Sequence, residues 1–298
     1  MNAPHASARD REDWPNKSAS RFVDAAGVRW HVQTAGDGPT LLLLHGAGAS
    51  TDSWRDLLPI LSQSFHVVAP DLPGQGRSEA GPSSVFPMRG MARAMSALVR
   101  RIGANPDIVV GHSAGAALAV RMSLDRLISP KLLIGLNAAL QPFGASMAPF
   151  FTGVAKFLAL NPVAPRLFAW RASRPGAVER LITETGSRID RRGVNLYRNL
   201  ATNPNHVAAT LRMMANWDVQ ELQSELPKLK APLHMLMGEC DRTITISQAS
   251  AIGRSAPHVQ IEQIAAVGHL AHEEKPELIA ARIIALARQY DSSPEHQK

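Results

Sequence analysis

Short apolar runs alternate with segments of helical periodicity along most of the chain. Every residue of Leu41–Leu44 is apolar, which is typical of a strand that is covered on both faces of a sheet. Comparable apolar or alternating runs predict seven strands, within 27–36, 39–48, 65–74, 107–112, 131–139, 231–241 and 259–269. Segments with helical periodicity lie at 52–64, 87–103, 113–125 and 275–290. Repeated strand–helix–strand units of this kind predict a mainly parallel sheet with helices on both faces.

The alternation stops between 141 and 230, where the pattern indicates several helices separated by prolines. A block of helices inserted into an α/β sheet predicts a cap over the ends of the strands. We therefore expect a flexible tail at 1–20, an α/β core built from 21–140 and 231–292, and a helical cap at 141–230.

One part of this block, 147–170, is notably apolar. Prolines interrupt it at 149, 162 and 165, which excludes a membrane-spanning helix. Its apolar side chains are expected to pack the cap onto the core, because large apolar residues are usually buried. The alternative is that this stretch rests on a membrane surface.

Charge is distributed unevenly along the 298 residues. The formal net charge is +7, and the segment Gln141–Lys230 holds 12 Lys/Arg and 6 Asp/Glu. This basic segment is either a solvated helical surface or a surface that attracts an anionic substrate, an anionic lipid or an acidic protein. Nucleic acid is not expected as a partner, because the basic residues are scattered and aromatic residues are few.

The cysteine content and the first 20 residues indicate the compartment. Cys240 is the single cysteine, so no internal disulfide can form, which suits a reducing compartment. The first 20 residues have no apolar core of the kind that a signal peptide needs. We therefore expect a soluble cytoplasmic protein.

The stretch "GHSAG" carries the strongest chemical signal. In this Gly-x-Ser-x-Gly pattern Ser113 follows an apolar strand and precedes an alanine-rich helix. Such a serine sits on a sharp turn, where Gly111 and Gly115 leave room for the crowded backbone and the hydroxyl is exposed. The pattern predicts that Ser113 is a nucleophile; the alternative is a purely structural turn.

A serine hydroxyl needs a base to take its proton, and the base needs an acid to fix its tautomer. His269 directly follows the last predicted strand and is the leading base, with His272 as the alternative. Asp241 lies just past a strand end and is the leading acid, with Glu239 as the alternative. The order Ser113, Asp241, His269 is the one expected where the nucleophile lies on a strand-to-helix turn.

Two further loops follow predicted strands. In "HGAGAS" the backbone N–H of Ala47 is the expected partner of the N–H of Ala114 in an oxyanion hole. His45 is expected to orient this loop and not to act as a base. In "DLPGQGRS" Asp71 is expected to be structural, and the lysine of a phosphate-binding loop is missing. No Cys/His set has zinc spacing, so we expect neither a metal nor a cofactor.

Together these motifs resemble the α/β-hydrolase fold with a cap domain, over about 22–290. The resemblance implies a mainly parallel eight-stranded sheet, and Ser113 argues against the relatives with an aspartate nucleophile, the epoxide hydrolases and haloalkane dehalogenases. One departure is Gln75, where many relatives carry histidine. On this reading the chain is a serine hydrolase that acts on an ester, or on a thioester or amide.

Four other stretches, 13–23, 28–33, 111–122 and 216–226, resemble the magnesium-chelatase accessory proteins of bacteriochlorophyll synthesis in photosynthetic bacteria. This narrower resemblance implies a role in porphyrin or bacteriochlorophyll synthesis, with magnesium chelatase as a partner. It also implies a cytoplasmic location, either free or peripheral to the photosynthetic membrane. The reaction is not transferred with the resemblance.

The substrate class follows from the cap and the resemblance together. An apolar cap favours a hydrophobic ester, and its arginines favour a carboxylate; a porphyrin ester has both. Two other functions stay open. One is a non-catalytic protein that binds a porphyrin or the chelatase. The other uses the same triad for different chemistry, as cofactor-free haloperoxidases, carbon–carbon bond hydrolases and hydroxynitrile lyases do.

Overall fold

The strand β3 (Thr40–Leu44) is buried on both faces in the computed structural model, which describes residues 14–141, 161, 163–256 and 258–291. Leu41 and Leu43 pack into the core on one face of the sheet, and Leu42 and Leu44 into the core on the other. Side chains alternate between the two faces of a strand, so a continuous apolar run is what a doubly covered strand requires.

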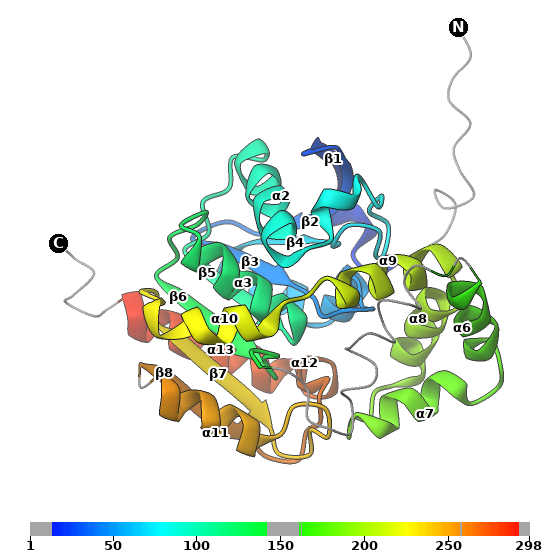
Figure 1. The fold of residues 1–298 in the computed structure, drawn as a ribbon. Helices are drawn as coiled ribbons and strands as arrows, with labels where there is room; N and C mark the ends of the chain where they lie inside the picture. The colour runs from blue at the N-terminus through cyan, green and yellow to red at the C-terminus, as the bar shows by residue number, and fades with distance from the viewer. Residues whose placement is uncertain (1–13, 142–160, 162, 257, 292–298) are drawn as a thin grey trace, which may run out of the picture.

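Eight strands form a single sheet in the order β1-β2-β4-β3-β5-β6-β7-β8 (Figure 1). β1 pairs with β2 and β2 with β4 in antiparallel fashion, and the remaining neighbours are parallel. The other strands are β1 (Ser20–Ala25), β2 (Val28–Ala35), β4 (His66–Pro70), β5 (Ile108–His112), β6 (Leu132–Leu136), β7 (Leu233–Gly238) and β8 (Val259–Ile264).

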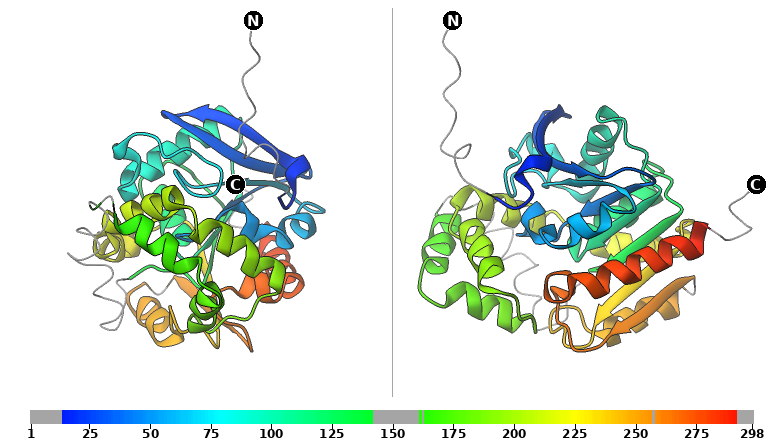
Figure 2. Two further views of the ribbon diagram at one scale, coloured as in Figure 1. Left: turned by 90° about the vertical axis from the view of Figure 1, so that its right-hand side faces the viewer. Right: turned by 180° about the vertical axis from the view of Figure 1, so that it is seen from behind.

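Helices cover both faces of the sheet (Figure 2). One core lies beneath α2 (Met88–Arg101), α3 (Ala114–Leu124), α10 (Val219–Glu225) and α11 (Ile246–Ser255). The other lies beneath α1 (Leu57–Leu61), α12 (Ala271–Glu274) and α13 (Pro276–Asp291). Short 3-10 helices occupy Lys17–Ala19, Thr51–Trp54, Ser83–Val85 and Leu226–Lys228.

The winding of the chain reverses at β3. From β3 the chain passes to β4 on one side and then returns to β5 on the other. In open parallel sheets the loops at such a reversal separate, and the crevice at the carboxyl ends of the strands is where ligands bind. The "HGAGAS" loop after β3 and the serine turn after β5 both lie at this crevice.

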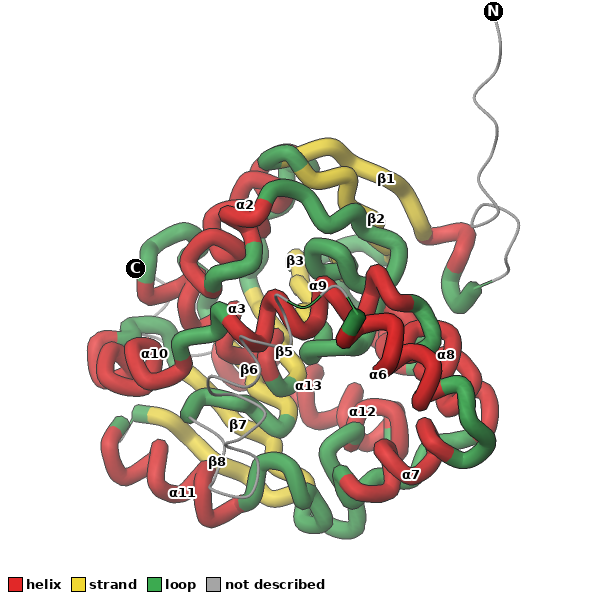
Figure 3. Tube along the Cα trace, turned by 45° about the vertical axis from the view of Figure 1, so that its right-hand side comes forward, coloured by secondary structure: helices red, strands yellow, loops and turns green. Residues whose placement is uncertain are grey.

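Four helices lie beyond the carboxyl ends of the strands, and we call them the cap helices. They are α6 (Ala164–Ala172), α7 (Ala177–Glu184), α8 (Arg191–Ala201) and α9 (Pro204–Ala215). Figure 3 shows α6, α7 and α8 together at one side of the molecule. Among the described residues, no helix combines the length and apolar character that crossing a bilayer requires.

The predicted fold class is confirmed: the sheet has eight strands, is mostly parallel and has helices on both faces. The seven individually predicted strands are present. The eighth, β1, and the helix α11 lie outside the stretches that the pattern singled out. The helix predicted at 52–64 is divided into the 3-10 turn Thr51–Trp54, capped by Ser50, and the short α1. Part of the apolar stretch, 147–160 and 162, lies outside the described residues.

Replacing Leu43 with alanine tests the core beneath α1 and α13. Leu43 is fully buried there. The substitution removes buried methyl groups and leaves a cavity, so the free energy of unfolding should fall by about 2–5 kcal/mol. Leu278→Ala is the matched control because Leu278 is 41% exposed, and its effect should stay within about 0.5 kcal/mol. Urea titration followed by circular dichroism measures both; equal losses would contradict this account of the core.

Candidate active site

Ser113 occupies a strained turn between β5 and α3. Its backbone has φ 50° and ψ −115°, outside the regions that non-glycine residues normally adopt. The Ser113 N–H donates to the carbonyl of Leu136 at 3.0 Å, and its own carbonyl accepts from the N–H groups of Ala116 and Ala139. These bonds hold the strained conformation, which is the local geometry expected of a nucleophile elbow.

Glycines around Ser113 are required by close backbone packing. A Cβ atom at Gly115 would overlap the carbonyl oxygen of Leu44, and one at Gly111 would overlap the backbone of Ala116. A Cβ at Gly46 would lie 2.8 Å from the ring of His112 and 3.3 Å from Cβ of Ser113. The loop after β3 therefore lies directly against the serine turn.

The two predicted oxyanion donors are free to bind a ligand. Neither the N–H of Ala47 nor that of Ala114 donates a hydrogen bond to another described residue. Ala114 is the first residue of α3, so its N–H lies at the positive end of the helix dipole.

Asp241 and His269 are brought together by the loops after β7 and β8. Nδ1–H of His269 donates to Oδ2 of Asp241 at 2.7 Å, and both residues are buried. The other carboxylate oxygen, Oδ1, accepts from the N–H groups of Thr243 and Ile244 at 2.7 and 2.9 Å. Asp241 therefore caps its own turn and at the same time holds the imidazole of His269.

The alternative acid and base lie elsewhere. Glu239 is exposed, and its carboxylate accepts from the N–H of Ala266. His272 is buried against Trp54, with ring centroids 4.6 Å apart, and neither of its ring nitrogens has a hydrogen-bond partner among the described residues. Burial, and then the neighbouring His269 and Arg55, lower the pKa of His272 to about 3.

A cluster of buried histidines connects the serine turn to His269. His112 immediately precedes Ser113, and its Nε2–H donates to the carbonyl of His269 at 3.0 Å. The His112 ring lies 4.8 Å from that of His269 and 4.6 Å from that of His272. Burial, followed by the two other histidines, holds the pKa of His112 well below its usual value. His112 and His272 are therefore neutral near pH 7.

Asn137 is a positioning residue that the sequence analysis missed. It follows β6, is fully buried and has a left-handed backbone with φ 46°. Its Nδ2 group donates to the carbonyls of Gly268 and His269 at 2.8 and 2.7 Å, and its Oδ1 accepts from the N–H of Gly238 at 2.6 Å. One amide thus ties together the loops that carry Asp241 and His269. Its place directly after an apolar strand was the available signal.

The loops after β3 and β4 are held by buried polar side chains. Nε2 of His45 accepts from the N–H of Leu72, and its Nδ1–H donates to the carbonyl of Gly46, so His45 orients the loop. Asp71 accepts from His31 at 2.8 Å. Burial opposes ionisation of Asp71, but His31 and neighbouring charges outweigh it and hold its pKa well below the usual range.

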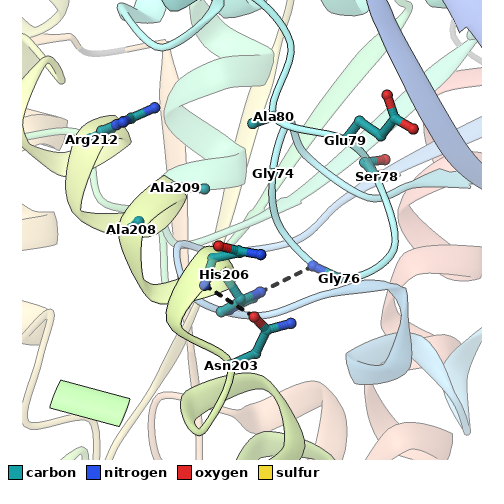
Figure 4. A pocket seen from close by; sticks show the side chains of 11 residues that line it. Gly74, Gly76, Ser78, Glu79, Ala80, Asn203, His206, Ala208, Ala209 and Arg212 are labelled. Carbon is teal, nitrogen blue, oxygen red and sulfur yellow. Dashed lines mark hydrogen bonds between the residues drawn. The ribbon is translucent and has the colours of Figure 1, made fainter. Parts of the chain in front are cut away.

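Helix α9 is fastened to these loops through His206. The N–H of Gly76 donates to Nδ1 of His206 at 3.1 Å (Figure 4). Nε2–H of His206 donates to the carbonyl of Gly48 at 3.1 Å. Gln75, at the position where many relatives have histidine, accepts from the N–H of Gly48 and donates to the sulfur of Met213. A pocket of about 300 Å³ lies here, and none of Ser113, Asp241 and His269 lines it.

Hydrogen bonds and apolar contacts join the other cap helices to the residues that follow His269. The N–H of Leu270 donates to Oγ of Ser187 at 2.8 Å, and the Leu270 side chain joins the small apolar core of the cap helices. Arg55 pairs with the buried carboxylate of Glu273, which also accepts from the hydroxyl of Tyr197 at 2.7 Å. The cap helices and the loop that carries His269 are therefore joined by buried contacts.

Comparison with known proteins identifies the family. The model of the alpha/beta hydrolase family matches residues 41–282. The chain belongs to this family. Ser113, Asp241 and His269 all lie inside the matched segment.

Relatives of this hydrolase span nearly its whole length. It is 36% identical to the magnesium-chelatase 30 kDa subunit of Rhodobacter capsulatus, over 91% of this chain and 95% of that protein. This similarity confirms the narrower resemblance inferred from the sequence. The structure of an epoxide hydrolase superposes with a TM-score of 0.76 at 24% identity, covering 91% and 98% of the two chains. A thermophilic esterase of Thermogutta terrifontis has a TM-score of 0.73 at 22% identity, covering 91% and 98%. These two structures share the fold.

Replacing His272 with leucine should make the hydrolase less sensitive to acid. The pKa of His272 is about 3 in the folded protein and near 6.5 in the unfolded chain, so only the unfolded chain gains this proton as the pH falls between those values. The free energy of unfolding therefore decreases with falling pH. In His272→Leu, the loss between pH 7.5 and 4.5 should be about 2.5 kcal/mol smaller than in the wild type.

Urea titrations at several pH values measure this difference. His258→Leu is the control because the His258 side chain lies on the surface. If His272→Leu and wild type lose stability in parallel from pH 7.5 to 4.5, His272 is not the buried neutral base described above.

Proposed function

We propose that this member of the alpha/beta hydrolase family is a serine hydrolase of carboxylic esters, with Ser113, His269 and Asp241 as its catalytic triad. The observation that carries the proposal is the 2.7 Å hydrogen bond between His269 and Asp241, in loops fastened to the strained turn of Ser113. The remaining steps of the reaction follow from this arrangement.

The hydrogen bond to Asp241 fixes the tautomer of His269. With its proton on Nδ1, His269 leaves Nε2 free to accept the proton of the Ser113 hydroxyl. Oγ of Ser113 then attacks the ester carbon and forms a bond to it. His269 returns the proton to the leaving alcohol as the ester C–O bond breaks. A water molecule that loses a proton to His269 then attacks the acyl carbon, the bond to Oγ breaks, and His269 returns that proton to Oγ of Ser113 as the acid leaves.

Charge develops in two places during this reaction. The tetrahedral intermediate carries an oxyanion, which the N–H groups of Ala47 and Ala114 accommodate. The imidazolium at His269 is stabilised by Asp241. The neighbouring rings of His112 and His272 are neutral, so they do not repel this positive charge. A pKa near 3 also makes His272 too weak a base to replace His269 near pH 7.

The substrate class that we propose is a hydrophobic ester, with a porphyrin ester of bacteriochlorophyll synthesis as the specific case. The similarity to a magnesium-chelatase subunit supports the porphyrin. The pairing of His269 with Asp241 supports a reaction that begins with attack by Ser113, and ester hydrolysis is the reaction of this kind that we propose.

Ser113→Ala should abolish covalent labelling by a fluorophosphonate probe and lower kcat for p-nitrophenyl esters by several orders of magnitude. The substitution removes the nucleophile and leaves the oxyanion donors in place, so a small residual rate over water should remain. His269→Ala should also lose labelling. His272→Leu is the matched control and should label at the wild-type rate.

Gel detection of the probe and steady-state kinetics measure these effects. Undiminished labelling of Ser113→Ala would disprove the assignment of the nucleophile. If a folded His272→Leu protein is not labelled and His269→Ala is still labelled, then His272 is the catalytic base in place of His269.

A second candidate function is that of an accessory protein of magnesium chelatase, and its support is the relative of that name. A groove of about 780 Å³ gives this candidate a place to dock. It lies at the loops that precede β6 and β7, at the end of the sheet away from Ser113. Arg126, Lys228 and Lys230 line it and form no ion pair with a described residue, so the groove suits an acidic protein surface.

Complementation of pigment synthesis in a deletion strain separates the two functions. If hydrolysis is the role, Ser113→Ala should fail to restore the pigment, and the charge reversal Lys228→Glu/Lys230→Glu should restore it. If docking is the role, Ser113→Ala should restore the pigment, and Lys228→Glu/Lys230→Glu should fail to restore it. Immunoblots of both variants establish that each accumulates to the wild-type level.

A further inference from the structure

The outer surface of α6 is apolar where a cap helix would normally be polar. Seven large apolar side chains are exposed in the described part of the chain, and five of them lie between 163 and 181. They are Val163 (60% exposed), Leu167 (52%), Phe168 (36%), Trp170 (55%) and Leu181 (56%). Exposed apolar residues scattered singly are ordinary, but a concentration of this kind marks an interaction surface.

The face that α6 turns toward the protein consists of three alanines and one proline. Ala164, Pro165, Ala169 and Ala172 are buried. Val163, Leu167 and Trp170 are spaced by four and three residues, so they lie in one stripe along the opposite side of the helix. The usual arrangement is inverted: packing against α9 and α8 uses alanine, and the large side chains face away.

Arginines flank the stripe. Arg166, Arg171 and Arg174 are exposed and make no ion pair with any residue that the structure describes. The guanidinium of Arg174 lies over the Trp170 ring, 4.2 Å from its centroid. From 163 to 178 the sequence contains no Asp or Glu. The surface is therefore apolar along its centre and purely cationic at its margins.

We propose that Val163, Leu167, Trp170 and the three arginines form a docking surface for an anionic lipid bilayer. A helix that lies in the bilayer interface buries its apolar stripe among the acyl chains, while arginines on its flanks contact the headgroup phosphates. Tryptophan is favoured at that depth because its ring is apolar and its N–H is polar. The cationic margins favour anionic lipid over an apolar protein partner, which would require no such rim.

The position of α6 fits this orientation. The cap helices lie beyond the carboxyl ends of the strands, on the side of the molecule that carries the loops after β3 and β5 (Figure 3). Docking through α6 therefore turns that side toward the bilayer and leaves the groove at Lys228 and Lys230 on the far end. The proposal does not depend on the triad and stands if the protein is not an esterase.

Flotation with lipid vesicles tests the proposal on the full-length protein. Wild-type protein should float with vesicles of phosphatidylcholine and phosphatidylglycerol at low salt, and float much less with phosphatidylcholine alone. Leu167→Gln/Trp170→Gln should weaken binding by roughly tenfold for each substituted side chain, because glutamine buries about half as much apolar area in the bilayer as the native side chain does. Leu278→Gln, which changes an exposed leucine on α13, is the matched control and should bind as the wild type does.

The charge contribution is tested separately. Arg166→Gln/Arg171→Gln/Arg174→Gln should weaken binding to the anionic vesicles by roughly fivefold per arginine and remove most of its salt dependence. Unchanged thermal unfolding shows that these surface variants remain folded.

Wild-type protein that does not float with anionic vesicles at low salt would overturn the proposal. So would variants of α6 that float as well as the wild type. Dimerisation would also overturn the proposal if light scattering shows that it depends on protein concentration, if Leu167→Gln/Trp170→Gln abolishes it, and if neither protein binds vesicles. A second copy of the chain would then cover this face.

Discussion

The carbonyl oxygen of Leu44 occupies the space where a side chain at position 115 would begin. This contact brings the end of β3 and the turn after β5 together, and the rest of the site depends on it. Because the two backbones touch, Gly115 must lack a side chain. Gly111 must lack one because of the backbone of Ala116, within the same turn in which Ser113 has φ 50°. Among the described residues, the N–H groups of Ala47 and Ala114 have no hydrogen-bond partner. The strain at Ser113 is compensated by the hydrogen bonds that its own N–H and carbonyl form with neighbouring residues.

The second half of the site is assembled by buried polar groups. Asp241 and His269 lie in loops that follow different strands, and Asn137, from a third strand, bonds to both loops. An unpaired buried amide or carbonyl is costly, so these bonds specify one arrangement of the loops. His112 adds a further bond from the residue beside Ser113. The position of His269 is therefore set both by the core and by the cap region, where Oγ of Ser187 accepts from the N–H of Leu270.

The sequence was sufficient to predict the elements that have a local apolar pattern and the turns whose motif requires glycine at fixed positions. The run Leu41–Leu44 predicted a doubly covered strand, and "GHSAG" predicted the elbow, since both follow from rules within a few residues. The cluster of His112 and His272 and the clamp of Asn137 were not predictable in this way. Their roles arise from partners more than 100 residues away, and no spacing along the chain reports such contacts. The hairpin strand β1 was also missed, because half of its residues are polar and it has no continuous or alternating apolar pattern. Pairing with β2 makes it a strand.

The apolar residues of α6 show that hydrophobicity along the sequence also cannot predict which side chains are buried. Hydrophobicity alone favours burial of Leu167 and Trp170, and the sequence analysis expected these side chains to pack the cap onto the core. The structure buries Ala164, Ala169 and Ala172 instead, because close approach of α6 to its neighbours leaves room only for small side chains. This part of the expectation was wrong. A helix whose largest apolar side chains lie outside the core gains free energy when a second apolar phase covers them. The three arginines at its margins form no ion pair with a described residue, and they favour an anionic bilayer as that phase.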